Sequence, residues 1–363
     1  MHNERITAVR QKLKAWQVDA LYVTHPIHRR WLSGFTGSAG ILLVTQDEAI
    51  IATDFRYYDQ VQAQAPTFTL FRSQRKPNET AVLLDKAGVQ TVGFESSHLT
   101  YSDYMKLPHN EAYTWKPLAE TLEPMRRQKT DAELDTIRRA AAITDRAMAA
   151  FPQLARPGLT EKALAWELEK QMRADGADGM AFPIIVASGP NAAHPHHRAG
   201  ERQLQEGDVI VVDMGAAVDG YMSDMTRTFH LGNTPSDTFW EIYNLTLKAQ
   251  ETALAEMRPG MTGAEMDSLA RDVIADGGHG AHFGHSLGHG LGLEVHEAPW
   301  LSQRYPDLVV EAGEVATIEP GIYVSDWGGV RIEDLVRLGK KRKTCPFYAS
   351  REGWEEAELV LPP

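Results

Sequence analysis

The chain has 363 residues, of which 43% are apolar and 24% are charged, and its formal net charge at pH 7 is −12. This composition is ordinary for a globular protein with a full core, and the acidic balance argues against a nucleic acid or an anionic membrane as the main partner. The single cysteine, Cys345, excludes an intrachain disulfide and a cysteine-based zinc site.

The amino-terminal part of the sequence alternates between helical and strand-like patterns. Apolar residues at helical spacing predict helices at 6–16, 57–65 and 80–88, the last of them ending at Gly88. Short apolar runs predict strands at 19–24, 40–45, 49–54 and 91–95. This alternation indicates a small α/β domain. Because domains hold about 100–200 residues, we expect a second one, and we place the boundary in the charged junction at 126–129, which gives domains 1–126 and 127–363.

The second part of the sequence opens with a strong helix signal. Thr130 followed by Glu133 fits a capping box at the start of a long helix. Further helices are predicted at 161–174, 238–257 and 263–275, and strands at 183–188, 208–215 and 221–231. From Gly278 onward, glycines and short apolar runs predict an antiparallel sheet.

Two features bear on location and partners. The basic run 340–343 follows the strand-like run 330–338, and we interpret it as a solvated turn and not as a nucleic-acid site. The first residues lack the apolar core of a signal peptide, and no window approaches ~18 uncharged apolar residues. Together with the single cysteine, these features predict a cytoplasmic protein that binds neither nucleic acid nor membrane.

The stretch FGHSLGHGLGLEVHE, residues 283–297, allows two different chemistries. Its G-x-S-x-G pattern is that of a serine hydrolase with Ser286 as the nucleophile. Such a triad follows the order serine, acid, histidine, and the only acid between Ser286 and His296 is Glu294. Glycines at 288, 290 and 292 also oppose the helix that must follow a nucleophile elbow. We therefore keep the serine hydrolase only as the alternative to a metal site.

Four acidic residues in apolar, strand-like surroundings favour the metal site. An Asp-Gly turn at 219–220 lies nearly midway between Asp213 and Asp224, so a hairpin there would bring these two like charges close together. Glu319 and Glu333 also lie among apolar residues. Each acid alone is readily explained as a turn former, a salt-bridge partner or an edge residue. Together with His289, however, they offer the ligands of two divalent cations that share bridging carboxylates, and the carboxylate-rich set favours manganese over cobalt or zinc.

Several motifs, in this order, resemble the pita-bread metallopeptidases. They are VVDMGAAVDGYMSDMTRTF, HSLGHGLGLEVHEAP, IEPGIY and GVRIEDLV, and the resemblance extends from about Thr130 to the end of the chain. FTGSAGILLVT and TDFRYYDQ also resemble the amino-terminal domain of the short bacterial Xaa-Pro peptidases, prolidase (Xaa-Pro dipeptidase) and aminopeptidase P. The resemblance implies an α/β amino-terminal domain and an α+β pita-bread (creatinase/aminopeptidase-like) catalytic domain with a curved antiparallel sheet.

The same resemblance implies roles for individual residues. Asp213 would bind one metal ion, His289 and Glu319 the other, and Asp224 and Glu333 would bridge both. Among the remaining residues, His196 and His296 match two active-site histidines, with His194 and His197 as competitors of His196. His285 matches a histidine near the substrate pocket, and Arg331 matches an arginine that supports the site through hydrogen bonds or an ion pair. We place both among the substrate-binding residues.

The implied activity is metal-dependent hydrolysis of the peptide bond before proline, by a hydroxide bridging two divalent metals. His296 or His196 would donate to the oxyanion and Glu319 would transfer the proton to the leaving nitrogen. We favour a Xaa-Pro dipeptidase, with Arg56 or Arg198 as cations for the substrate carboxylate. The alternative is an aminopeptidase acting on longer proline-containing peptides; a non-catalytic peptide-binding relative is a more distant one. Dimerisation is also expected from the resemblance.

Overall fold

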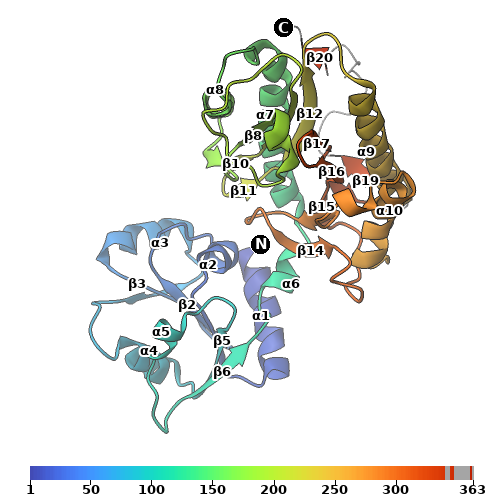
Figure 1. Cartoon of the computed structure of the whole chain (residues 1–363). Coiled ribbons are helices and arrows are strands. Elements are labelled where there is room, and N and C mark those ends of the chain that lie inside the picture. The colour runs from blue at the N-terminus through green and yellow to red at the C-terminus, as the bar shows by residue number, and fades with distance from the viewer. Residues whose placement is uncertain (340–343, 347–359, 362–363) are drawn as a thin grey trace. The chain divides into compact units, whose positions relative to one another are not determined.

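The computed structural model describes residues 1–339, 344–346 and 360–361. It divides into two compact units, Met1–Met125 and Arg126–Pro363 (Figure 1). The basic turn expected at 340–343 lies outside the described residues. Within the described part of the chain, no helix combines the length and the apolar character needed to cross a bilayer.

The amino-terminal unit is built on one mixed six-stranded sheet with the order β4-β3-β2-β1-β5-β6. Its strands are β1 (Ala20–Val23), β2 (Ile41–Thr45), β3 (Ala49–Thr53), β4 (Thr69–Arg72), β5 (Thr91–Glu95) and β6 (Thr114–Leu118). Its helices are α1 (His2–Trp16), α2 (Pro26–Ser33), the 3-10 helix η1 (Phe55–Tyr57), α3 (Tyr58–Gln64), α4 (Glu79–Ala87) and α5 (Tyr101–Tyr104). Helix α4 ends where predicted, because Gly88 adopts a left-handed φ of 66° and its N–H bonds to the last turn.

The carboxy-terminal unit begins at Arg126, the last residue of α6 (Glu123–Arg126). Its long helices are α7 (Asp131–Leu154), α8 (Glu161–Ala174), α9 (Asp237–Glu256) and α10 (Gly263–Asp276), with the short 3-10 helices η2 (Gly189–Ala193) and η3 (Gly280–His282). The capping box predicted at Thr130 and Glu133 is formed at the start of α7.

Short strands, nearly all paired antiparallel, form the middle of this unit. One group comprises β7 (Gly179–Met180), β8 (Ile185–Ser188), β9 (Val209–Met214), β10 (Ala216–Val218), β11 (Tyr221–Met222), β12 (Met225–Leu231) and β20 (Val360–Leu361). The other comprises β13 (Gly288–Gly290), β14 (Glu297–Leu301), β15 (Val315–Ile318), β16 (Gly321–Val324), β17 (Gly328–Arg331), β18 (Asp334–Leu338) and β19 (Thr344–Pro346). The exception to the antiparallel pairing is β20, which runs parallel to β12.

Two apolar clusters pack helices against these strands from opposite sides (Figure 1). In the first cluster, Leu134 and Phe151 of α7 pack with Val212 of β9 and Phe229 of β12. In the second cluster, residues of α9 and α10 pack with Ala316 and other side chains of β15 to β18. The strands that carry the polar residues of the site are therefore held between two helical layers.

The strand-like segments around three predicted ligands are interrupted where those ligands lie. The predicted strand at 330–338 divides into β17 and β18, with Glu333 in the break, and Glu319 follows the end of β15 in the same way. At Glu319 the chain passes from the five-stranded sheet to the two-stranded sheet, and at Glu333 it passes back. Asp224 likewise precedes β12. The prediction of continuous strands is therefore wrong here. At each break the backbone leaves the ladder of strand hydrogen bonds, so the carboxylate can point into a cavity.

Candidate metal centre

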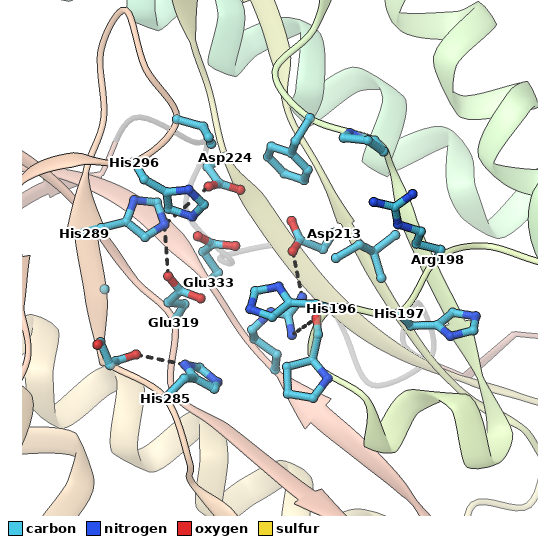
Figure 2. Close-up of a pocket in the computed structure, with 18 of the residues that line it drawn as sticks. His196, His197, Arg198, Asp213, Asp224, His285, His289, His296, Glu319 and Glu333 are labelled. Carbon is cyan, nitrogen blue, oxygen red and sulfur yellow. Dashed lines mark hydrogen bonds and ion pairs between the residues drawn. The ribbon is translucent and has the colours of Figure 1, made fainter. Parts of the chain in front are cut away.

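A cavity of about 450 Å³ in the carboxy-terminal unit gathers the chemically active side chains. Figure 2 shows them converging from the two groups of strands and from the loop after η2. All five predicted metal ligands line it: Asp213, Asp224, His289, Glu319 and Glu333. So do the predicted residues His196, His285, His296 and Arg331, together with Arg198 and Ser286.

The Asp213 and Asp224 side chains come from neighbouring strands and point to one face. The hairpin turn has Asp219 and Gly220 at φ 46° and 73°, as a tight two-residue turn requires. Thr226 lies directly opposite Asp213. Asp224 is two residues before Thr226, so it shares that face and lies diagonally across from Asp213.

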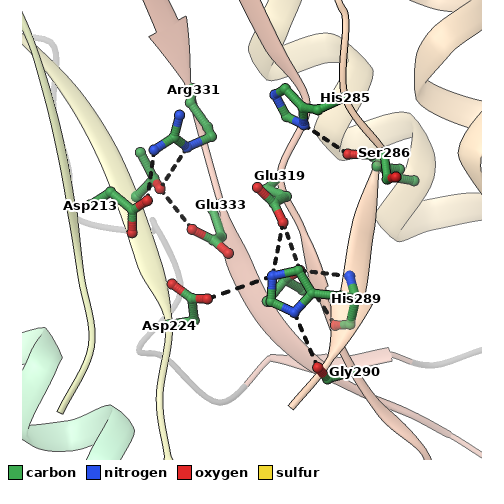
Figure 3. Close-up of polar contacts among 12 residues, drawn as sticks. Asp213, Asp224, His285, Ser286, His289, Gly290, Glu319, Arg331 and Glu333 are labelled. Carbon is green, nitrogen blue, oxygen red and sulfur yellow. Dashed lines mark hydrogen bonds and ion pairs between the residues drawn. The ribbon is translucent and has the colours of Figure 1, made fainter. Parts of the chain in front are cut away.

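The three ligands from the second group of strands surround the same point (Figure 3). His289 Nε2 lies 3.2 Å from Glu319 Oε1 and 3.8 Å from Asp224 Oδ2. His289 Nδ1 lies 3.1 Å from the carbonyl oxygen of Gly290, so it is the protonated nitrogen and Nε2 faces the carboxylates. Asp224, His289 and Glu333 each offer one ligand atom, and these atoms lie within 4.8 Å of one another.

The electrostatics of this cluster call for cations. Burial, reinforced by the neighbouring carboxylates Glu333, Asp213 and Glu319, raises the pKa of Asp224 well above its usual range. Burial also raises the pKa of Glu333 and, against the opposing charge of Arg331, that of Asp213. Three carboxyl groups are therefore driven toward protonation when only protein surrounds them.

Glu319 and His289 form an ion pair within the cluster. Burial favours the neutral form of Glu319, but the hydrogen bond and charge of His289 lower the pKa of this carboxyl to about 2. Burial likewise opposes charge on His289, whereas the hydrogen bond with Glu319 raises the imidazole pKa overall. Without metal, the proton on His289 offsets the negative charge of Glu319 only, and the other three carboxyl groups have no such partner within the pair.

The donor set fits divalent cations. It contains four carboxylates and one imidazole nitrogen facing one space. Asp213 Oδ1 is buried and accepts no hydrogen bond from an N–H or O–H of the described residues. Carboxylate oxygens with one imidazole are suited to hard or borderline divalent ions. Such ions would stabilise the charged forms that burial disfavours.

Arg331 makes hydrogen bonds to residues of the cluster through all three nitrogens of its guanidinium group. Its Nη2 donates to Asp213 Oδ2 at 2.7 Å and its Nε to Thr226 Oγ1 at 3.0 Å. Its Nη1 donates to the Tyr323 hydroxyl at 2.8 Å. Thr226 in turn donates to Glu333 Oε2 at 2.7 Å. The guanidinium therefore contacts one predicted ligand, Asp213, directly and a second, Glu333, through Thr226. These bonds leave it little capacity for substrate, and its substrate-binding role stays a prediction.

The three predicted active-site histidines lie around the ligands. His296 packs edge-on against His289, with ring centroids 4.2 Å apart. His285 Nε2 is 2.9 Å from the Tyr323 hydroxyl, and burial lowers the pKa of this imidazole. His196 and its competitor His197 both line the cavity, but His197 Nε2 lies 2.8 Å from the buried carboxylate of Glu161. The other competitor, His194, is not among the residues that line the cavity.

Arg56 lies in the other unit. There its Nε and Nη2 donate to the two carboxylate oxygens of Asp54 at 2.8 and 2.9 Å. This bidentate pair explains its conformation within the amino-terminal unit, and a role in substrate binding stays a prediction.

Sequence reasoning missed Thr226, which joins Arg331 to Glu333, and two further residues of the site. Tyr323 bridges His285 and Arg331 through its hydroxyl, and burial raises its pKa to about 12. Thr317 accepts from the His289 N–H at 3.0 Å and donates to Glu319 at 3.1 Å. Thr317 lies two residues before Glu319 and Tyr323 four residues after it, and this closeness to a predicted ligand was the only signal in the sequence. The fold was needed to show which neighbours the two side chains contact.

Ser286 has the wrong surroundings for a nucleophile elbow. It follows η3 and is followed two residues later by strand β13, not by a helix. Its carbonyl oxygen lies 2.9 Å from His285 Nδ1. The serine-hydrolase alternative therefore lacks the strand–turn–helix geometry on which it depends.

Comparison with known proteins gives concordant results. Residues 135–340 match the model of metallopeptidase family M24, and residues 5–128 match that of the Creatinase/Prolidase N-terminal domain. A short match to the DEAD_2 model over residues 326–363 overlaps the M24 match at 326–340, a range that includes Arg331 and Glu333.

Relatives match over nearly the whole length. The chain is 35% identical to the Xaa-Pro dipeptidase of Pyrococcus furiosus over 346 residues, covering 94% of this chain and 97% of that protein. It superimposes on the Xaa-Pro dipeptidase from Bacillus anthracis with a TM-score of 0.92 and 39% identity, covering 96% of this chain and 98% of that one. The X-Pro aminopeptidase from Thermotoga maritima gives a TM-score of 0.86 and 34% identity, with 95% and 97% covered.

Proposed function

Because this chain belongs to metallopeptidase family M24 and its carboxy-terminal unit has the pita-bread fold, we propose that it hydrolyses the peptide bond preceding proline, as a Xaa-Pro dipeptidase. The observation that carries the proposal is the convergence of four carboxylates and one imidazole on one cavity.

Five residues would hold the two divalent cations. Asp213 would bind one ion, His289 and Glu319 the other, and Asp224 and Glu333 both, with manganese as the proposed metal because carboxylates dominate the set. When bound, the two ions supply a water of lowered pKa and polarise the scissile carbonyl.

The side chains around the ligands carry the remaining chemistry. Glu319 would carry the proton, because a carboxylate beside the scissile bond can accept a proton and pass it to the leaving nitrogen. His296 and His196 line the cavity and would donate to the oxyanion that develops at the scissile carbonyl. His285, held by Tyr323, would contact the substrate beside them.

The cavity wall suits a residue without an amide hydrogen. Apolar and aromatic side chains line it at Phe182, Pro183, Ile185, Val295 and Trp300. A pyrrolidine ring can be recognised by apolar contact alone, because its imide nitrogen has no hydrogen to donate.

Arg198 is the proposed partner of the substrate carboxylate within this unit. It is exposed and lines the cavity, on the side away from His289 and His296 in Figure 2. A guanidinium can bind a carboxylate with two parallel hydrogen bonds. Arg56 of the amino-terminal unit is the second proposed cation.

The alternative function is a Xaa-Pro aminopeptidase on longer peptides, favoured by the likeness to the Thermotoga maritima protein. Turnover of a Xaa-Pro dipeptide and a Xaa-Pro-Xaa tripeptide decides between them. A dipeptidase should prefer the dipeptide at least tenfold in kcat/KM, and Arg198→Met should reduce that preference mainly through KM. A preference for the tripeptide would overturn the dipeptidase proposal.

Chelation tests the metal chemistry itself. We expect a chelator to abolish Xaa-Pro hydrolysis and manganese or cobalt to restore it. Full activity after chelation, lost instead with a serine-directed reagent, would restore the Ser286 hypothesis. A chain that binds Xaa-Pro peptides without turnover under any metal would be a binding relative.

Two further expectations belong to the same proposal. We propose a homodimer, from the resemblance to the Xaa-Pro peptidases, and a cytoplasmic location, from the single cysteine. Light scattering of the purified protein tests the first, and a single monomeric mass at micromolar concentration would contradict it.

A further inference from the structure

The turn that carries His296 is bracketed by two glutamates that bind cations from the start of the carboxy-terminal unit. Arg126 Nη1 lies 2.8 Å from Glu294 Oε2, and its Nη2 donates to Glu297 Oε2. Lys129 Nζ donates to Glu297 Oε1 at 2.8 Å. Glu294 and Glu297 are the acids two residues before and one residue after His296.

Three of these four side chains are buried. Those of Arg126 and Lys129 are 3% and 2% exposed and that of Glu297 is 10% exposed, whereas the Glu294 side chain is 37% exposed. Ion pairs on a surface contribute little to order, whereas breaking a buried pair leaves an uncompensated charge and is strongly unfavourable. The Glu297 carboxylate and its two buried cations therefore fix the turn far more firmly than surface pairs would, and the partly exposed Glu294 adds less.

The local backbone is adapted to this arrangement. A Cβ at Gly292 would lie 2.7 Å from Glu297 Oε1, so the glycine makes room for the carboxylate. The N–H of Gly292 donates to the carbonyl of Glu294 at 3.0 Å, and its carbonyl accepts from Met222. Glu297 lies opposite Gly290 in the β13–β14 ladder, next to His289. The turn is thus fixed at both ends, with His296 between them.

We propose that Arg126 and Lys129 are positioning residues, which hold Glu294 and Glu297 so that the His296 imidazole faces the metal ligands. The inference rests on the proposed role of His296 in Xaa-Pro hydrolysis. Arg126 is the first residue of the carboxy-terminal unit, so these contacts lie wholly within that unit.

A double-mutant cycle on the manganese-loaded enzyme tests this role. Arg126→Met should lower kcat about tenfold or more, with KM within about twofold, because a misplaced donor weakens the transition state more than the ground state. In the His296→Ala background the same substitution should change kcat less than about twofold. Equal losses of kcat in both backgrounds, or no loss in the first, would overturn the proposal.

A neighbouring arginine provides the matched control. Arg127 pairs with the buried Glu314 at 2.6 Å, and neither of these residues contacts the His296 turn among the described contacts. Arg127→Met should therefore destabilise the protein without lowering kcat more than about twofold. If Arg126→Met fails to fold, the nearly isosteric Glu297→Gln takes its place in the cycle, with the same expected non-additivity.

Amide hydrogen exchange separates this proposal from the proposed function. Exchange in a peptide covering 291–297 should be faster in Arg126→Met than in wild type and unchanged in Arg127→Met. If the protein shows this exchange pattern but has no Xaa-Pro activity, the proposed function is refuted, while the proposal that Arg126 and Lys129 hold the His296 turn stands. Unchanged exchange in Arg126→Met would refute the anchoring, whatever the activity.

Discussion

Two irregular segments bring histidines to the same cavity, and they are anchored in different ways. The loop that carries His196 is held by Glu161, a fully buried residue at the start of α8. Its carboxylate accepts from the Ser188 N–H, the Asn191 amide and the Gly200 N–H, and contacts His197 Nε2. The turn that carries His296 is held instead by ion pairs with Arg126 and Lys129.

The difference lies in charge and in distance along the chain. Glu161 lies 27–39 residues before the donors that it binds, and most of those donors are neutral. Arg126 lies 171 residues from Glu297. A local carboxylate can order its loop as soon as α8 and the following segment are formed. The ion-paired turn can be ordered only when the start of the carboxy-terminal unit meets the segment before β14, so its geometry depends on the tertiary fold.

The largest expected effect removes the centre that both histidines face. Asp224→Asn should lower kcat at least about 1000-fold, because the substitution removes a charge from a residue proposed to bind both metal ions. Asp219→Asn, in the same hairpin but paired with Arg139 on the surface, is the control and should keep wild-type activity. Activity of Asp224→Asn near the wild-type level, measured with excess manganese, would refute the bridging assignment.

The next effect concerns the contact that joins the His196 loop to the metal ligands. Arg331 donates to Asp213 and to the Pro195 carbonyl, one residue before His196. Arg331→Lys keeps the charge but loses the planar fork, so manganese affinity should fall about 10- to 100-fold. Calorimetric titration with manganese measures it, and Arg139→Lys is the matched surface control. Unchanged affinity would show that the fork is dispensable.

Glu161→Gln removes the carboxylate that holds the loop carrying His196. An amide group cannot accept from all the donors that the carboxylate binds, so buried N–H groups lose partners at about 1–3 kcal/mol each. We expect a lower Tm and a kcat lowered about tenfold, which the His196→Ala background should mask. Glu169→Gln, on the same helix and paired with Arg173, should change neither. Additive losses of kcat with His196→Ala would mean that Glu161 acts on folding alone.

The smallest effect is a pH dependence of the metal-free protein. Asp213, Asp224 and Glu333 have raised pKa values through burial, so their stabilising contribution is present when they are protonated and is lost as pH rises through the folded pKa. The pKa of His289 is raised by Glu319, and its contribution is also lost with rising pH. Glu319, with a pKa of about 2, loses its contribution only in strong acid. The metal-free Tm should therefore fall by at least about 2–4 °C between about pH 5 and pH 8.

Calorimetry with and without manganese checks this sign. The manganese-loaded protein should show a flatter profile, because bound cations stabilise the charged carboxylates. Asp224→Asn removes one carboxyl group with a raised pKa, so the Tm of the metal-free variant should fall less steeply with pH. Asp219→Asn should keep the wild-type dependence of Tm on pH. Parallel profiles for the two forms would contradict the assignment of the buried carboxylates.

Much of the fold followed from local signals. Helix α8 has the predicted bounds, the capping box at Thr130 opens α7, and the Asp-Gly pair forms the hairpin turn. These signals act over a few residues, through helical spacing, side-chain capping and left-handed φ angles, so they can be read without the tertiary structure. The strands β4 and β6 were missed because they are short and partly exposed, which leaves them without a clear apolar run.

By itself, the sequence determined that acids with no place in an apolar strand recur at Asp213, Asp224, Glu319 and Glu333, and that they need a cation. Tertiary structure alone decided that Glu319 and Glu333 lie at breaks between strands and that Arg331 is occupied by protein partners. The same holds for Arg126, which binds the turn beside His296. The physical reason is that the cost of burying a charge can be read from its neighbours in the chain, whereas the partner that offsets it can lie more than a hundred residues away.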